Sequence, residues 1–495
     1  MRTPSRAGLL LPTYSDVLFV FIVIFSFIAG EMGWQRLLQD ADTGLHIRIG
    51  DYILANRQVP TQDMFSFSLP GQTWYAFEWL TEILFSFLHT RFGLKGVVLV
   101  SGIVLAGTLV GMFQFAIRRG ANSLIALALL LLAVSANSLH FHARPHIFTL
   151  LFLTVSTWMI WADRQRPGPW IWLLVPLTIV WTNLHGGFLI FFPLLALLVL
   201  GCALDRRMGA AIRYAMVATF CGLASLVNPY GIKLHEHIVE IMRASWVIDT
   251  IDEFRSPQFR TEAQLHLMIL LFLGLIVITP LLAKRRVTEA LWILFLAYSA
   301  LTSVRHGPIF TLVAVPIIAV ELSEWWTAWV SHQPKNSIPA VLDGIAAQLG
   351  AGFRRPSLWT LVAVLFIALT GSIHWPTDFP EKNFPEEIIQ RHADQIATAR
   401  ILTTDQWGDY LIYRNYPRQR VFLDGRTNYY GPKILSEYSG MMDGQRTWRE
   451  ILERYRFDLI LCSPDAALAS LIRIDPEWRT VDSDTKAVLF AKRVQ

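Results

Sequence analysis

The chain has 495 residues, of which 53% are hydrophobic and only 16% are charged, and its mean hydropathy is +0.41. This apolar content exceeds what a soluble core needs and therefore excludes a soluble globular protein. The formal net charge of +5 comes largely from short loops between apolar runs. It indicates membrane topology and contact with anionic membrane lipids, and no nucleic acid is expected as a partner.

Apolar runs long enough to cross a hydrocarbon layer, about 20 residues each, recur along most of the chain. They lie near residues 14–34, 94–117, 121–140, 147–162, 170–184, 188–204, 211–228, 265–283, 289–304, 308–327 and 357–374. The predicted fold class is an α-helical polytopic membrane protein with about 11 transmembrane helices. The first run lacks a clear cleavage site, so we expect it to remain as an anchor.

Lysine and arginine collect in every second loop, as they do in loops that stay in the cytoplasm. The groups are Arg2 and Arg6, Arg118-Arg119, Arg164 and Arg166, Arg206-Arg207 with Arg213, Lys284-Arg285-Arg286, and Arg354-Arg355. This pattern predicts a cytoplasmic N-terminus in a bacterial inner membrane. Because the number of spans is odd, a transmembrane domain at residues 1–374 is followed by an extracytoplasmic domain at residues 375–495.

The first outer loop, residues 35–93, is long and carries two amphipathic helical patterns. The first follows Asp42-Thr43, a candidate N-cap pair, and its apolar stripe is Leu45, Ile49 and Ile53. The second runs from Trp79 to Leu88, opposite Glu78 and Glu82. Because the second pattern is too short and polar to span the bilayer, the loop is predicted to hold two interfacial helices.

The same loop carries Asp40 and Asp42 directly after the first apolar run. A carboxylate at a membrane surface can be partly desolvated and act as a general base or a metal ligand. Asp42 and His46 share a helix face at i and i+4, so Asp40, Asp42 and His46 form a candidate site for Mg²⁺ or Mn²⁺. The alternative is that Asp42 only caps the helix that follows.

Polar side chains gather at the predicted outer ends of the spans, whereas the span centres hold almost no ionisable residues. An ion-coupled transporter needs such residues near the midplane, so a reaction centre at the outer surface fits better. Arginine and histidine at these ends can bind a phosphate, or can instead anchor the helix ends to lipid headgroups. The candidate phosphate-binding residues are His142, Arg144, His146, Arg255, Arg305 and His306.

Three further residues, His46, Glu78 and His185, are candidates for supporting roles in the site. For Glu78 the alternative is a solvated helix face. For His185, which follows Asn183 between two apolar runs, the alternative is a side chain that satisfies backbone groups at a turn.

The last 120 or so residues have a soluble composition and predict a small α/β domain. The strand-like stretches are 399–403, 410–414, 420–424, 457–461 and 487–492, and a helical stretch covers 447–456. Asp424-Gly425-Arg426 ends one of these strands. It is expected either to touch a substrate or to form a turn held by a salt bridge.

Nucleotide-activated substrates are scarce outside the cell. An acidic side chain together with several arginine and histidine side chains there therefore indicates a lipid-phosphate donor. Transfer of a sugar from a polyprenyl phosphate leaves an anionic phosphate, whose departure needs arginine, histidine or a metal ion. Asp42, with Asp40 as its neighbour, would be the base for the acceptor hydroxyl of a glycan, lipid or protein. One direct displacement would invert the anomeric carbon.

Several segments together resemble the GT-C superfamily of membrane-embedded glycosyltransferases. They are Asp40-Ala41-Asp42-Thr43-Gly44-Leu45-His46, Glu78-Trp79-Leu80, Trp407-Gly408-Asp409-Tyr410-Leu411-Ile412 and Asp424-Gly425-Arg426. The resemblance covers most of the chain and is greatest to uncharacterised bacterial members. It implies a transferase that depends on a polyprenyl-phosphate sugar, with Asp42, or with less support Asp40, as the catalytic residue.

Two other classes remain open on the sequence alone. A lipid or polysaccharide transporter would move a labelled lipid without glycosyl transfer. A noncatalytic membrane scaffold, whose outer domain recruits partners, would keep its cellular function in an Asp42→Asn variant.

Overall fold

The computed structural model describes residues 11–28, 33–244, 246, 251–354, 357–370 and 373–493. Of the arginines predicted to be cytoplasmic, Arg2, Arg6 and Arg355 lie outside these residues. The chain divides into two compact units. The helical unit comprises residues 1–37, 98–232 and 248–374, and the sheet unit comprises residues 38–97, 233–247 and 375–495.

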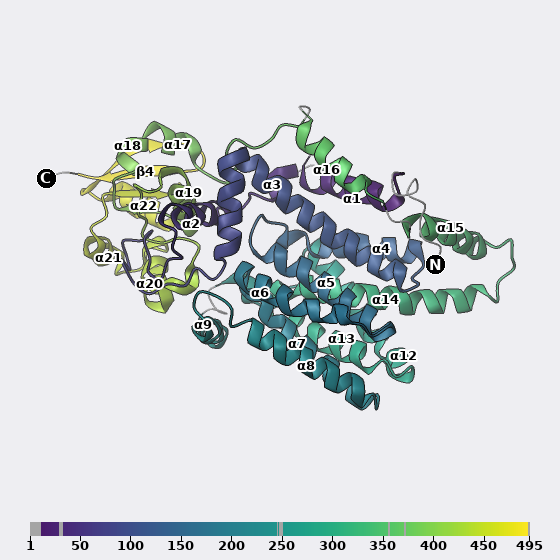
Figure 1. Ribbon diagram of the computed structural model, residues 1–495. Coiled ribbons are helices and arrows are strands. Elements are labelled where there is room, and N and C mark those ends of the chain that lie inside the picture. The colour runs from purple at the N-terminus through teal and green to yellow at the C-terminus, as the bar shows by residue number, and fades with distance from the viewer. Residues whose placement is uncertain are drawn as a thin grey trace. The chain divides into compact units, whose positions relative to one another are not determined.

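The helical unit is built from apolar helices (Figure 1), and several of their connections contain a short 3-10 turn. Its α-helices are α1 (Tyr14–Phe27), α4 (Ser123–Ala136), α5 (His146–Gln165), α6 (Leu174–Leu184), α7 (Phe191–Leu204), α8 (Met208–Ala224), α11 (Glu262–Ile276), α12 (Ile278–Ala283), α13 (Val287–Thr302), α14 (Gly307–Val330), α15 (Ile338–Phe353) and α16 (Trp359–Leu369). Side chains cap the N-termini of several of these helices. At α4, for example, the Asn122 side chain accepts hydrogen bonds from the amides of Leu124 and Ile125.

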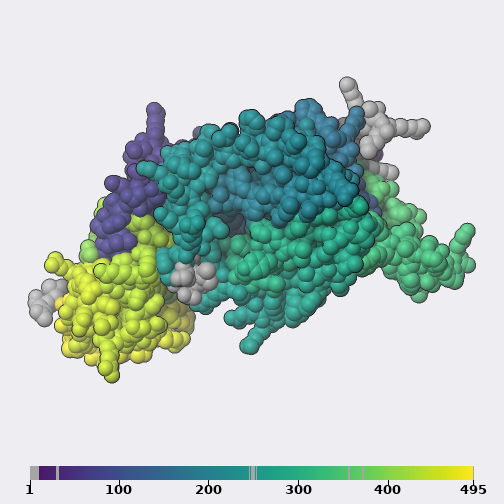
Figure 2. Space-filling view, turned by 90° about the horizontal axis from the view of Figure 1, so that it is seen from below, coloured from purple at the N-terminus to yellow at the C-terminus, as the bar shows by residue number. Residues whose placement is uncertain are grey.

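Helix α14 forms the core of this unit, because α4, α5, α11 and α13 all pack against it. In the apolar stretch within Val304–Val330, 89% is buried inside the protein. The other helices expose many large apolar side chains, among them Met208, Ile212, Met216 and Phe220 along α8. Figure 2 shows the teal and green surface that the middle of the chain forms. Apolar side chains in such numbers on the outside of a helical body suit lipid rather than water.

Five helical segments among the described residues are long and apolar enough to cross a membrane. They are Trp79–Arg118, His146–Gln165, Gly186–Leu204, Glu262–Ala283 and Val304–Val330. Seven apolar helices among the described residues are shorter, including α15, which lies between the predicted spans at 308–327 and 357–374. The coarse class, a largely helical protein with several apolar helices, is confirmed, whereas the count of about 11 spans is not.

The two helical patterns of the first loop form α2 (Asp42–Asn56) and the start of α3 (Trp79–Arg118). Helix α3 also contains the apolar run predicted at 94–117. The backbone leaves helical geometry at Gly93, with φ of 64° and ψ of −163°. This conformation strongly favours glycine, so Gly93 separates the two parts that the sequence predicts.

The sheet unit contains a four-stranded sheet in the order β1-β2-β4-β3. Strand β1 (Ile401–Leu402) is parallel to β2 (Leu459–Cys462), and β4 (Val488–Lys492) is antiparallel to both β2 and β3 (Trp478–Ser483). The helices of this unit include α9 (Ile232–Arg243), α17 (Glu386–Arg391), α18 (Ala393–Ile396), α19 (Asp405–Asn415), α20 (Thr427–Met442), α21 (Trp448–Tyr455) and α22 (Ala467–Ile474).

Most of the predicted α/β elements are present, but the stretch 410–414 is helical and belongs to α19. Residues 408–413 are all buried, so their apolar run showed no helical period. The stretch 420–424 is not a regular strand. Its Val421 instead forms single bridges with Ile401 and with Ser66 of the first loop.

Candidate functional site

Helix α2 begins at Asp42 itself, and Ala41 occupies the N-cap position. The Asp42 amide donates a hydrogen bond to Oδ1 of Asp40 at 2.9 Å, and the Ala41 amide donates to Oε1 of Gln406 at 3.1 Å. The interpretation of Asp42 as only an N-cap is therefore wrong, because Asp40 and Gln406 accept the amides at this end. A carboxylate in the first turn is still favoured by the helix dipole.

Two glycines let α2 lie close to its neighbours in the sheet unit. A Cβ atom at Gly44 would come within 3.0 Å of the Tyr413 side chain on α19. A Cβ at Gly50 would come equally close to the Glu82 carbonyl and the Ser86 side chain on α3. Since Asp42, His46 and Gly50 follow at i, i+4 and i+8, they share the face of α2 that meets the start of α3.

His46 lies between two carboxylates on that face. Its Nδ1 is 3.3 Å from Oε1 of Glu82, and its Nε2 is 3.6 Å from Oε2 of Glu78. Burial of the ring lowers the pKa of His46, but the hydrogen bond to Glu82 and the charges of Glu78, Glu82 and Asp42 outweigh it and raise the pKa above its usual value.

His46, Glu78 and Glu82 also suit a divalent cation. Each offers one ligand atom, and these atoms lie within 4.8 Å of one another. An imidazole with two carboxylates is a donor set that Mn²⁺ or Zn²⁺ accepts. The structure thus joins His46 to two glutamates of the second helical pattern, whereas the sequence grouped it with Asp40 and Asp42.

Asp42 also meets the C-terminal region, where α19 carries Asp409. The two carboxyl groups converge on Gly425, where an added Cβ atom would lie within 3.0 Å of Oδ1 of Asp42 and of Oδ2 of Asp409. The Gly425 amide donates to both oxygens of Asp409 at 3.1 and 3.0 Å. Burial and the charges of Asp42 and Asp424 raise the pKa of Asp409 well above its usual value.

Asp424 and Arg426 form a buried ion pair next to this point. Arg426 donates from Nε to Oδ1 of Asp424 at 2.9 Å and from Nη2 to Oδ1 of Asp63 at 2.6 Å. Its guanidinium also lies 4.7 Å from the ring centre of Trp74. The structural interpretation of Asp424-Gly425-Arg426, a turn held by a salt bridge, is therefore confirmed, and the bridge extends to the first loop.

In the helical unit, two of the three candidate phosphate-binding arginines share one carboxylate. Arg144 Nη1 is 3.2 Å from Oε1 of Glu253, and Arg305 Nη2 is 3.2 Å from Oε2 of the same residue. The charges of Arg305 and Arg144 outweigh burial and lower the pKa of Glu253 to about 2. The structure thus brings Arg144 and Arg305 together around the Glu253 carboxylate.

Two of the other candidates in this unit are histidines whose side chains reach backbone carbonyls. His146 Nε2 lies 2.8 Å from the His140 carbonyl, and His306 Nδ1 lies 3.2 Å from the Ser299 carbonyl. His185 accepts the Gly187 amide at 3.0 Å, as its structural alternative requires. The carbonyls of His142 and Arg255 accept the amides of Arg144 and Val304.

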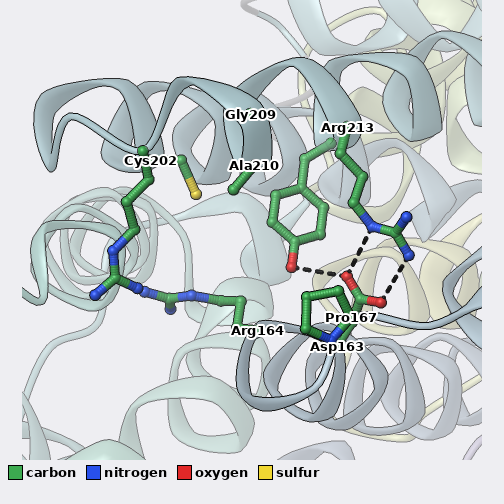
Figure 3. A pocket seen from close by; sticks show the side chains of 9 residues that line it. Asp163, Arg164, Pro167, Cys202, Gly209, Ala210 and Arg213 are labelled. Carbon is green, nitrogen blue, oxygen red and sulfur yellow. Dashed lines mark hydrogen bonds and ion pairs between the residues drawn. The ribbon is translucent and has the colours of Figure 1, made fainter.

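A cavity of about 210 Å³ opens elsewhere in the helical unit, at the ends of α5, α7 and α8. Figure 3 shows Asp163 at one side of the cavity beside Arg213, while Arg164 extends toward the other side and passes below Cys202 in this view. Arg213 and Tyr214 donate to the Asp163 carboxylate, while Arg164 pairs with Glu289 at 3.0 Å. These ion pairs join helix ends, and none of the predicted site residues lines the cavity.

Sequence reasoning did not assign Glu82, Asp409 or Glu253 to a site, and it named Gly425 only within a segment that could touch a substrate. A signal existed for Asp409 and Gly425, which lie in the two C-terminal segments that carry the family resemblance. Glu82 follows Glu78 at i+4 on one helix face, which also marks it as a possible second ligand.

Comparison with known proteins shows the fold of the chain. No family model matches the sequence, and no curated protein matches it. A solved structure of the Archaeoglobus fulgidus oligosaccharyltransferase, tethered to an acceptor peptide by a disulfide bond, aligns with a TM-score of 0.57 and 12% identity, over 90% of this chain and 68% of that chain.

Two further structures from the same organism are similar. The oligosaccharyltransferase AglB in complex with an inhibitory peptide and a dolichol-phosphate aligns with a TM-score of 0.54 and 12% identity, over 91% of this chain and 69% of that chain. A complex with zinc and sulfate has a TM-score of 0.56 and 11% identity, over 91% of this chain and 68% of that chain. The chain therefore shares the fold of these membrane glycosyltransferases.

Proposed function

We propose that this chain is a GT-C glycosyltransferase that moves a sugar from a polyprenyl-phosphate donor to an acceptor at the extracytoplasmic membrane face, with inversion. The observation that carries the proposal is Asp42, the first residue of α2, beside a partly buried cluster suited to a cation. The shared fold supports it, since one similar structure holds a dolichol-phosphate and another an acceptor peptide.

In this reaction Asp42 accepts the proton of the acceptor hydroxyl as the oxygen attacks the anomeric carbon. The bond from that carbon to the donor phosphate breaks, and its electron pair leaves with the phosphate. Arg144 and Arg305 bind the phosphate and stabilise the charge that develops on it. Back-side attack inverts the configuration.

We place the cation at His46, Glu78 and Glu82, whose ligand atoms converge. A bound Mn²⁺ or Mg²⁺ would supply positive charge for the donor phosphate. We expect His46→Ala to weaken Mn²⁺ binding by about 10-fold or more, measured by titration of the purified protein with the metal. His392→Ala is the matched control, because His392 pairs with Asp482 in the same unit. Equal Mn²⁺ affinity in wild type and His46→Ala would move the cation elsewhere.

Donor binding is expected to depend on the two arginines that share Glu253. Arg144→Ala and Arg305→Ala should each raise the KM for the donor about 10-fold, because each removes a charged hydrogen bond worth about 1.5 kcal/mol. Glu253→Gln should lower this KM, since the carboxylate competes with the phosphate for both arginines. Arg166→Ala, in an exposed loop predicted to be cytoplasmic, is the control. An unchanged KM in both arginine variants would remove them from the site.

Mass spectrometry of lipid that copurifies with the protein tests the donor class directly. A bound polyprenyl phosphate or its glycoside is the expected result. Movement of a labelled lipid between leaflets by purified protein, without glycosyl transfer, would instead establish the transporter alternative.

A further inference from the structure

The sheet unit places a second carboxyl group against Asp42. Asp409 is fully buried on α19, and the backbone amide of Gly425 fixes both of its oxygens. Helix α19 reaches this position because Gly408 allows close packing: a Cβ atom there would come within 3.0 Å of the Leu423 carbonyl. The Asp409 carboxyl is therefore held by its own helix and by the turn that follows Leu423.

Gly425 is the residue on which the two carboxyl groups converge. A Cβ atom at Gly425 would lie within 3.0 Å of both Asp42 Oδ1 and Asp409 Oδ2. Every other residue type would thus push these oxygens away from the turn. Asp424 and Arg426, on either side, are locked to each other and to Asp63, so the turn cannot easily yield.

We infer that Asp409 is a positioning residue for Asp42, and that Gly425 provides the space in which the two carboxyl groups meet. This inference rests on the proposed role of Asp42 as the base. Asp409 acts by holding the Asp42 carboxylate in one orientation toward the acceptor hydroxyl. Region 375–495 then contributes to catalysis, because a misplacement of about 1 Å at a reacting group can cost about 100-fold in rate.

Three variants test this role. Asp409→Ala and Gly425→Ala should each lower kcat about 100-fold, with an unchanged KM for the donor. Asp409→Asn should retain kcat within a few-fold, because its amide nitrogen can donate to Asp42 and its oxygen can accept the Gly425 amide. Gly344→Ala is the matched glycine control, since that helical position in α15 has open space around it. Gel filtration and thermal unfolding in detergent confirm that each variant is folded.

Wild-type kcat in folded Asp409→Ala and Gly425→Ala would overturn the inference. So would an Asp409→Asn variant as inactive as Asp42→Asn, because Asp409 would then act through its own chemistry. A contact test independent of activity compares the unfolding temperatures of Asp42→Ala, Asp409→Ala and the double variant. If the wild-type protein shows no transferase activity but the shifts in unfolding temperature are non-additive, the proposed function is refuted and the pairing is kept. Additive shifts would refute the pairing.

Discussion

Asp42→Asn should lower the rate of glycosyl transfer by about 10²- to 10⁴-fold, the usual contribution of a general base. Asparagine keeps the size of the side chain but cannot accept the proton of the acceptor hydroxyl. Donor binding should survive, because the change leaves Arg144 and Arg305 intact. Transfer from a labelled donor, measured with purified protein at saturating donor, gives the effect on kcat.

Asp40→Asn is the matched control for this experiment. Asp40 accepts the Asp42 amide, and an asparagine oxygen can accept the same bond. Its transfer rate should therefore remain within a few-fold of wild type. An inactive Asp40→Asn variant beside an active Asp42→Asn variant would move the base to Asp40.

Arg426→Ala should have the largest effect on stability in the sheet unit. The change leaves the buried carboxylates of Asp424 and Asp63 without their shared cation, and breaking a buried ion pair in this way costs about 3–5 kcal/mol. The expected result is a lower unfolding temperature in detergent and faster proteolysis of residues 375–495.

Arg391→Ala provides the comparison, because this arginine pairs with Glu387 and Asp482 at the protein surface. Exposed pairs contribute about 0–1 kcal/mol, so its unfolding temperature should remain close to that of wild type. Equal losses in Arg391→Ala and Arg426→Ala would show that the buried network does not stabilise the unit.

Patterns of apolar residues along the sequence predicted the helices and strands whose signal lies within a few neighbouring residues. The stripe of Leu45, Ile49 and Ile53 predicted α2 because helical periodicity is a local property. The strand at 487–492 was equally clear from its apolar run. The helix at 410–414 was missed because residues buried on several sides lose the amphipathic period that identifies a helix.

The sequence by itself determined the class of the protein, since its apolar content and the apolar runs suit lipid, and it determined the acidic start of α2. Only the tertiary structure decided which groups meet Asp42 and His46. Asp63 and Arg426 pair across 363 residues of chain, and Asp409 reaches Asp42 through the packing of α19 against α2. Helical spacing relates residues within one or two turns, whereas such distant contacts depend on how whole elements pack.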